Sequence, residues 1–106
     1  MRDTLGHFEY QVLATLQLQP RDAYGVTIRA RIKERTGREP SVGALYTTLE
    51  RLEEKGFIRS QVGESTPERG GRAKKYFAIT GAGVSAVRRT EAQYSAFSQS
   101  LAPQGT

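Results

Sequence analysis

Residues 41–56 read SVGALYTTLERLEEKG, and the pattern predicts one helix with a signal at each end. Pro40 disfavours helical geometry at the residue before it, and Ser41 can cap the first free N–H groups. Gly56 can adopt the left-handed conformation that closes a helix C-terminus. Helical spacing puts four apolar side chains on one stripe, which we expect to face the core: Val42, Leu45, Leu49 and Leu52.

The opposite face of this helix begins with small, neutral side chains. A helix whose N-terminus approaches a DNA duplex needs such a first turn, because bulk would hold the groove away. The helix dipole also favours phosphate at that end. An amphipathic helix alone is more often plain scaffold, so this interpretation depends on the residues that follow. On or beside this face, the residues expected to contact DNA are Ser41, Gly43, Ala44, Tyr46, Thr47 and Arg51.

Two strand candidates come after the helix, at residues 57–62 and 75–79, with a polar connection over residues 63–71. Glycines make the hairpin tip thin, and basic residues surround them. A helix followed by a basic hairpin is the order of a winged helix-turn-helix, in which the helix enters the major groove and the hairpin lies over the flanking backbone or minor groove. The wing residues expected to contact DNA are Arg69, Gly70, Gly71, Arg72 and Lys74.

The composition sets limits on the class of protein. A chain of 106 residues predicts one domain, and a net charge of +5 favours a polyanionic partner, here double-stranded DNA. The absence of cysteine excludes disulfides, thiolate metal sites and a thiol nucleophile. No apolar run is long enough to span a bilayer, and the N-terminus lacks a hydrophobic signal core, so we expect a cytoplasmic protein. The sequence shows no nucleophile–base pair, metal cluster or phosphate loop, and we expect no enzymatic activity, cofactor or metal site.

Two further helices are predicted before residue 41. An apolar stripe starting at Leu5 predicts a helix that ends before Pro20. Asp22 is a good cap for a second helix, which should stop at Thr36-Gly37. Arg38, in the turn before Ser41, is well placed to meet a phosphate. The basic residues of the second helix form either a solvated face or phosphate contacts, and the sequence leaves this open for Arg29, Arg31, Lys33 and Arg35.

A last helix is predicted after Thr80, which can cap it. Apolar residues recur every seven positions along it, which suits packing against another helix. We predict that this helix pairs with a second copy of the chain, although it could fold back on the first helix, and both contacts could occur together. The dimer contacts are assigned to Val84, Val87, Tyr94 and Phe97. The expected architecture is mainly α with a small β-hairpin: a winged helix-turn-helix over 1–79, a dimerisation helix over 80–99 and a flexible tail over 100–106.

These motifs together resemble the PadR family of bacterial transcriptional regulators. The matching segments are 23–26 (AYGV), 41–46 with the leucines after it, and 69–77 (RGGRAKKYF), followed by Thr80 and Gly83. The resemblance covers about residues 5 to 90. It implies a winged helix-turn-helix, a homodimer formed through the C-terminal helix, repression from palindromic operators, and room for a small effector that remains unidentified. Many members have proline where this chain has Thr47, and the C-terminal region is short for the family.

Several residues keep two interpretations. The Tyr46 hydroxyl is expected to reach a phosphate while its ring packs against neighbouring residues. For Tyr24, a phosphate contact and packing in the core are equally expected. One of Tyr76 and Phe77 should be buried, because they alternate along a strand. The competing function is a winged-helix protein–protein interaction module without sequence-specific DNA binding. Salt-sensitive binding to duplex DNA would separate the two functions.

Overall fold

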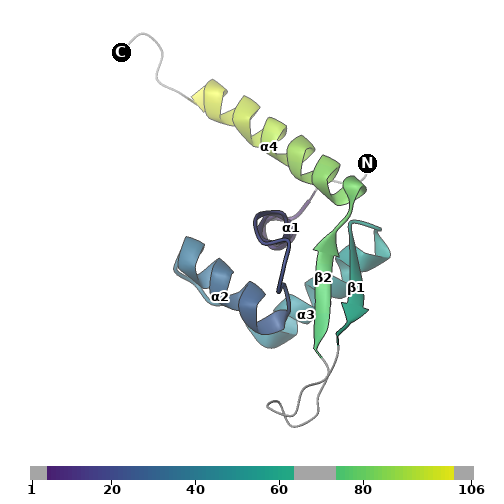
Figure 1. Cartoon of the computed structure of the whole chain (residues 1–106). Coiled ribbons are helices and arrows are strands. Elements are labelled where there is room, and N and C mark those ends of the chain that lie inside the picture. The colour runs from purple at the N-terminus through teal and green to yellow at the C-terminus, as the bar shows by residue number, and fades with distance from the viewer. Residues whose placement is uncertain (1–4, 64–73, 102–106) are drawn as a thin grey trace.

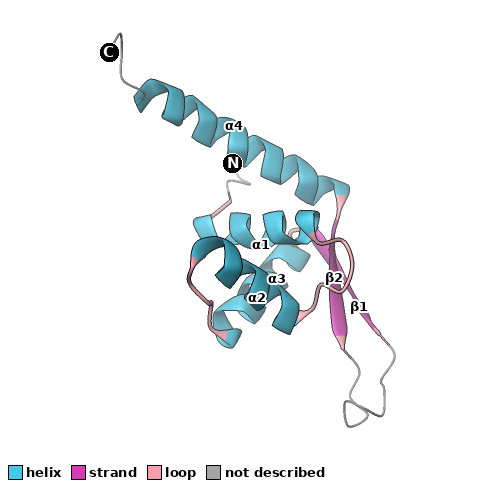
Figure 2. Ribbon diagram, turned by 60° about the vertical axis from the view of Figure 1, so that its left-hand side comes forward, coloured by secondary structure: helices cyan, strands magenta, loops and turns pink. Residues whose placement is uncertain are grey.

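The computed structural model describes residues 5–63 and 74–101, and the described part confirms the predicted fold class, mainly helical with a small β-hairpin. The elements are α1 (His7–Leu18), α2 (Gly25–Thr36), α3 (Val42–Glu54), β1 (Ile58–Val62), β2 (Lys75–Ile79) and α4 (Gly81–Leu101). Helices α1, α2 and α3 pack together, the β1–β2 hairpin lies beside them, and α4 crosses over α1 and extends past the body (Figures 1 and 2).

The core lies where the three N-terminal helices meet. Its largest fully buried side chains come from α1, α2 and α3, and include Leu13, Leu16, Ile28, Leu45, Leu49 and Leu52. Val42 was predicted to join this stripe, and that prediction was wrong, because 51% of its surface is exposed. The buried face of α3 is rotated toward Thr48, which is buried instead, and Val42 lies at its edge in the first turn.

Both predicted ends of α3 are confirmed. The Ala44 N–H donates to Ser41 Oγ at 3.1 Å, which is the expected N-cap. At the other end Gly56 has a φ of 81°. Its N–H donates to the Glu53 carbonyl, and the Phe57 N–H donates to the Leu52 carbonyl, each at 3.0 Å. These two bonds form a Schellman motif, which satisfies the last carbonyls and turns the chain toward β1.

The start of α2 differs from the prediction. Asp22 does not cap this helix: it adopts a φ of 58°, and Tyr24 occupies the N-cap position. The hydroxyl of Thr27, the third residue of α2, accepts the N–H of this N-cap residue at 3.1 Å, which fixes the start of the helix without capping its own first N–H groups. The predicted end is confirmed, because Gly37 has a φ of 80° and donates its N–H to the Lys33 carbonyl.

The hairpin is antiparallel, with Ser60 opposite Phe77. The extended segment before α2 lies along β2, because the Phe77 N–H donates to the Ala23 carbonyl at 2.8 Å. Phe77 is buried and Tyr76 is only half-buried, as their alternation predicted. The hairpin is thus attached to the start of α2 as well as to the end of α3.

Helix α4 is buried along one side of its first half, and its second half is exposed. Its buried residues are Gly83, Ala86, Val87 and Thr90, and it packs against α1 and β2. Val87 is only 3% exposed, so assigning it to a dimer contact was wrong, since its side chain is used within the subunit. Val84 is half-buried. The helix runs to Leu101, two residues past the predicted boundary, and residues 102–106 lie outside the described part.

Two tyrosines attach the middle of α4 to α1. The Tyr10 hydroxyl donates to Glu91 Oε2 at 2.8 Å, and this bond to a carboxylate raises the pKa of Tyr10. The Tyr10 and Tyr94 rings meet edge to face, with centroids 6.1 Å apart. The contact that the sequence left as an alternative, α4 folded back on α1, is therefore present, and the C-terminal end of α4 extends past α1 (Figure 2).

A buried carboxylate connects α1 to the end of α3. Glu9 Oε1 accepts the Gly6 N–H at 2.8 Å, and Oε2 accepts from Lys55 Nζ at 3.1 Å. Burial raises the pKa of Glu9, but the Gly6 N–H and the Lys55 ammonium more than offset it, so the pKa of the carboxyl is lowered. A carboxyl whose pKa is lower in the folded state stabilises the fold above its unfolded value of about 4.3 and loses that contribution below it.

We expect Glu9→Gln to lower the free energy of unfolding at pH 7 by about 1 kcal/mol, the size of a partly exposed ion pair. The gap between wild type and variant should narrow as the pH falls below about 4.3, where the carboxyl of the unfolded chain takes up a proton, and it should close at lower pH as the folded carboxyl does so too. Urea unfolding at pH 7 and pH 3.5 measures both effects. Glu34→Gln is the control, since the Glu34 pair with Arg31 is exposed. Parallel stability curves for wild type and Glu9→Gln would contradict this expectation.

Candidate nucleic-acid interface

The first turns of α3 form an open surface. Gly43, Ala44 and Thr47 are all exposed, and a Cβ placed on Gly43 would have no atom within 4 Å. Val42, which the sequence assigned to the core, lies beside them and adds an apolar side chain to this surface. Farther along, the same face carries the exposed side chains of Glu50 and Glu54, which would repel phosphate. The surface suited to DNA is therefore confined to the N-terminal half of α3.

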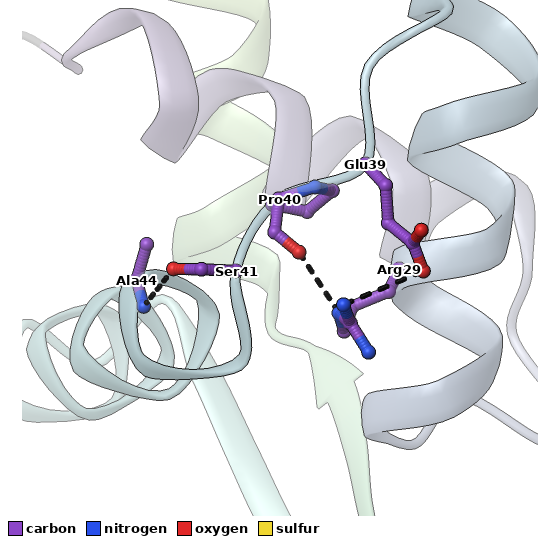
Figure 3. Close-up of polar contacts among 5 residues, drawn as sticks. All are labelled: Arg29, Glu39, Pro40, Ser41 and Ala44. Atoms are coloured by element: carbon purple, nitrogen blue, oxygen red, sulfur yellow. Dashed lines mark hydrogen bonds and ion pairs between the residues drawn. The ribbon is translucent and has the colours of Figure 1, made fainter.

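The turn before α3 is held by Arg29. Its Nε donates to the Pro40 carbonyl at 2.9 Å, and its Nη2 lies 3.4 Å from Glu39 Oε2 (Figure 3). Arg29 therefore orients the turn that delivers Ser41 to its capping position, and a phosphate contact of its guanidinium stays untested. Arg38 is exposed in the same turn. Of the other basic residues of α2, Arg31 pairs with Glu34 at 3.7 Å, whereas Lys33 and Arg35 are exposed.

Tyr46 joins α3 to the start of α2. Its ring meets Phe77 edge to face, with centroids 6.5 Å apart, and 40% of the residue is exposed. Its hydroxyl lies directly over Gly25, where a Cβ would collide with it. Gly25 is the first residue of α2, so the phenol reaches the N-terminal end of this helix, where the backbone N–H groups have no partner within the helix. The packing role of Tyr46 is observed, and its phosphate contact stays a prediction.

The root of the wing lies against the same end of α2. The Tyr24 and Tyr76 rings meet edge to face at 5.5 Å, and Lys74 Nζ lies 3.8 Å from the centroid of the Tyr24 ring. The Gly63 N–H donates to the Lys74 carbonyl at 2.7 Å, which closes the hairpin stem. These contacts bring together the start of α2, the first half of α3 and the base of the wing. The predicted contacts at Arg69, Gly70, Gly71 and Arg72 lie outside the described residues.

Arg51 does not join this group. It is exposed in the last turn of α3, two turns beyond Ala44, and its charge helps to lower the pKa of Glu9 on α1. Sequence reasoning also missed the structural roles of Arg29 and Gly25. The glycine in the AYGV motif was a signal for the second, because a glycine at the start of a helix often marks a close approach.

Within residues 5–63 and 74–101, no three His, Cys, Asp or Glu side chains gather in a way that could hold a metal ion. Across the same residues, each helix is too short or too polar to cross a membrane. The exposed first turns of α3 and the turn before them offer hydroxyls and a cationic side chain, which are among the groups that contact phosphate and base edges in protein–DNA complexes.

Comparison with known proteins places the chain in a family. The sequence model of the transcriptional regulator PadR-like family matches residues 12–89, most of the chain. A PadR family transcription regulator from Clostridium difficile R20291 superposes with a TM-score of 0.74 at 23% identity, covering 91% of this chain and 95% of that one. A PadR-like transcription factor from Bacteroides fragilis gives a TM-score of 0.76 at 28% identity, covering 89% and 85%.

A Streptococcus transcriptional regulator gives a TM-score of 0.68 at 26% identity, covering 89% of this chain and 87% of that one. Comparison with curated protein sequences gives no match. The matching family model and the fold shared with these regulators point to the same family, and the exposed first turns of α3 are consistent with it. The chain belongs to the PadR-like family of transcriptional regulators.

Proposed function

We propose that this protein is a sequence-specific DNA-binding repressor that acts as a homodimer on a palindromic operator. The observation that carries the proposal is the surface formed by Gly43, Ala44 and Thr47, next to the α2 start and the wing root. On this surface α3 enters the major groove, and Thr47 offers a hydroxyl or a methyl group to a base edge. The free N–H groups of α2 and the Tyr46 hydroxyl meet the adjacent phosphates.

The exposed end of α4 supports the homodimer. Tyr94, Phe97 and Leu101 recur at helical spacing, and Phe97 and Leu101 are 69% and 81% exposed. A lone helix extending into water would not stably expose such a stripe, so a second copy is the economical partner. Two reading helices about a two-fold axis can enter successive major grooves, which lie about 34 Å apart on one side of the duplex.

Operator selection from random duplex DNA tests this function. Purified protein should enrich two inverted half-sites about one helical turn apart, and the logarithm of its affinity should fall linearly as the logarithm of the salt concentration rises. The slope should grow by about 0.9 for each phosphate contact. Enrichment of no sequence, together with binding that does not respond to salt, would favour the protein–protein interaction module.

Gly43→Gln is expected to leave the fold intact and to weaken operator binding by 10-fold or more. The added side chain enters open space in the free protein, but it stands where α3 must approach the base edges. Gly81→Gln is the matched control, because Gly81 also starts a helix and also has open space around its Cα. Circular dichroism and titration of the selected operator measure the two properties. Equal operator affinity for both variants would remove α3 as the reading element.

A further inference from the structure

The start of α4 is bonded to the turn that ends α3. The Thr80 N–H donates to the Phe57 carbonyl at 3.0 Å, and the Thr80 hydroxyl donates to the Gly56 carbonyl at 2.7 Å. The same hydroxyl accepts the Gly83 N–H at 3.1 Å. One threonine therefore caps α4 and holds it against the end of α3, which confirms its predicted capping role and adds a second one.

Gly83 brings the two backbones into direct contact. It is buried, and a Cβ at this position would collide with the Phe57 carbonyl oxygen and come within 2.7 Å of Ile79 Cγ1. A backbone carbonyl cannot swing aside as the end of a flexible side chain can. Any larger residue must therefore move the axis of α4. Gly81, two residues earlier in the same helix, has no atom within 4 Å of the corresponding Cβ position.

On the other side of this junction, the turn at Gly56 and Phe57 is fixed to α3, the helix proposed to read the bases. The Phe57 N–H bonds to the carbonyl of Leu52, which is fully buried, so the turn cannot shift without moving α3. Hydrogen bonds through this turn thus connect α3 with α4, the helix that carries the exposed apolar stripe. Both figures show α4 leaving the body at the end of the hairpin (Figures 1 and 2).

We propose that Gly83 determines which half-site spacing the operator must have, by setting the angle between α4 and α3. This inference rests on the proposed function, because it requires a dimer on two half-sites. Helix α4 has 21 residues and is therefore about 30 Å long. A tilt of about 10° at its base moves its far end by about 5 Å, more than the rise of about 3.4 Å per base pair of B-DNA.

Operators selected with wild type, Gly83→Ala and Gly81→Ala test the proposal. Gly83→Ala should keep the wild-type bases within each half-site and change the preferred separation by one base pair or more. On the wild-type operator its affinity should fall 10-fold or more, whereas its affinity for a single half-site should stay within 2-fold of wild type. Gly81→Ala should match the wild type in every one of these measurements.

Two outcomes would overturn the inference in different ways. A wild type that selects a palindrome, with Gly83→Ala selecting the same spacing at the same affinity, overturns this inference alone. A wild type that selects no paired half-sites overturns the proposed function and this inference with it. If Gly83→Ala fails to fold, Thr80→Val provides the same test by removing both hydroxyl bonds. It should broaden the range of accepted spacings, and Thr80→Ser should restore the single one; no change in Thr80→Val overturns the inference.

Discussion

A chain that ends at Ala92 is expected to be a folded monomer that has lost most of its affinity for a palindromic operator. The truncation keeps Thr90 in the core and the Tyr10–Glu91 hydrogen bond, so the winged domain retains its packing. It removes Tyr94, Phe97 and Leu101, the exposed stripe assigned to the dimer. Two linked reading domains gain about 10²–10⁴-fold in affinity over one, and the truncated chain should lose that factor.

Sedimentation at micromolar concentration and operator titration measure the two effects of the truncation. The double variant Phe97→Ala, Leu101→Ala should reproduce them in a full-length chain. Gln93→Ala, Ser98→Ala is its control, because it changes exposed polar residues of the same helical segment. A full-length wild type that sediments as a clean monomer would defeat the dimer proposal.

Leu49→Ala is expected to lower the free energy of unfolding by about 2–5 kcal/mol. Leu49 is fully buried on the side of α3 that faces the core, and its truncation leaves a cavity. Because small domains have only about 5–15 kcal/mol of stability, the variant should lose a large part of its own. DNA binding should weaken only as far as the folded fraction falls. Urea unfolding followed by far-ultraviolet circular dichroism gives the free energy directly.

Val42→Ala provides the contrast with Leu49→Ala. Val42 has the same helical spacing in the sequence, but it is half exposed, so its truncation should change the free energy of unfolding by less than about 0.5 kcal/mol. If Val42 contacts DNA, its effect should instead be found in operator affinity. Equal destabilisation by the two variants would place Val42 in the core, as the sequence alone suggested.

Helix ends and strands were predictable because their signals are local. Ser41, Gly37 and Gly56 each act through the backbone within a few residues, so the sequence was enough to locate them. The start of α2 was predicted wrongly because more than one nearby polar side chain can bond to the backbone there. Asp22 adopts a left-handed conformation, and the N-cap lies two residues later at Tyr24, whose N–H bonds to the Thr27 hydroxyl.

Contacts between elements were less predictable. Helical spacing gives the apolar stripe of a helix, but the neighbours that cover it decide which edge of the stripe is buried. For this reason Val42 was assigned to the core and Val87 to a dimer contact, and both were wrong. The role of Arg29 was hidden for a further reason, because its partners Glu39 and Pro40 lie in a turn whose path the sequence does not specify.

The open first turns of α3 have a consequence for how such a regulator can change its target. Gly43 and Thr47 contribute nothing to the core, so under the proposed function we expect their replacement to change the operator preference with little loss of stability. New binding preferences can therefore arise by single substitutions, with the scaffold unchanged. Tyr46 is the exception, because its hydroxyl fills the space over Gly25. A residue larger than glycine at position 25 demands a smaller side chain at position 46, so we expect the first change to occur only together with the second as such proteins diverge.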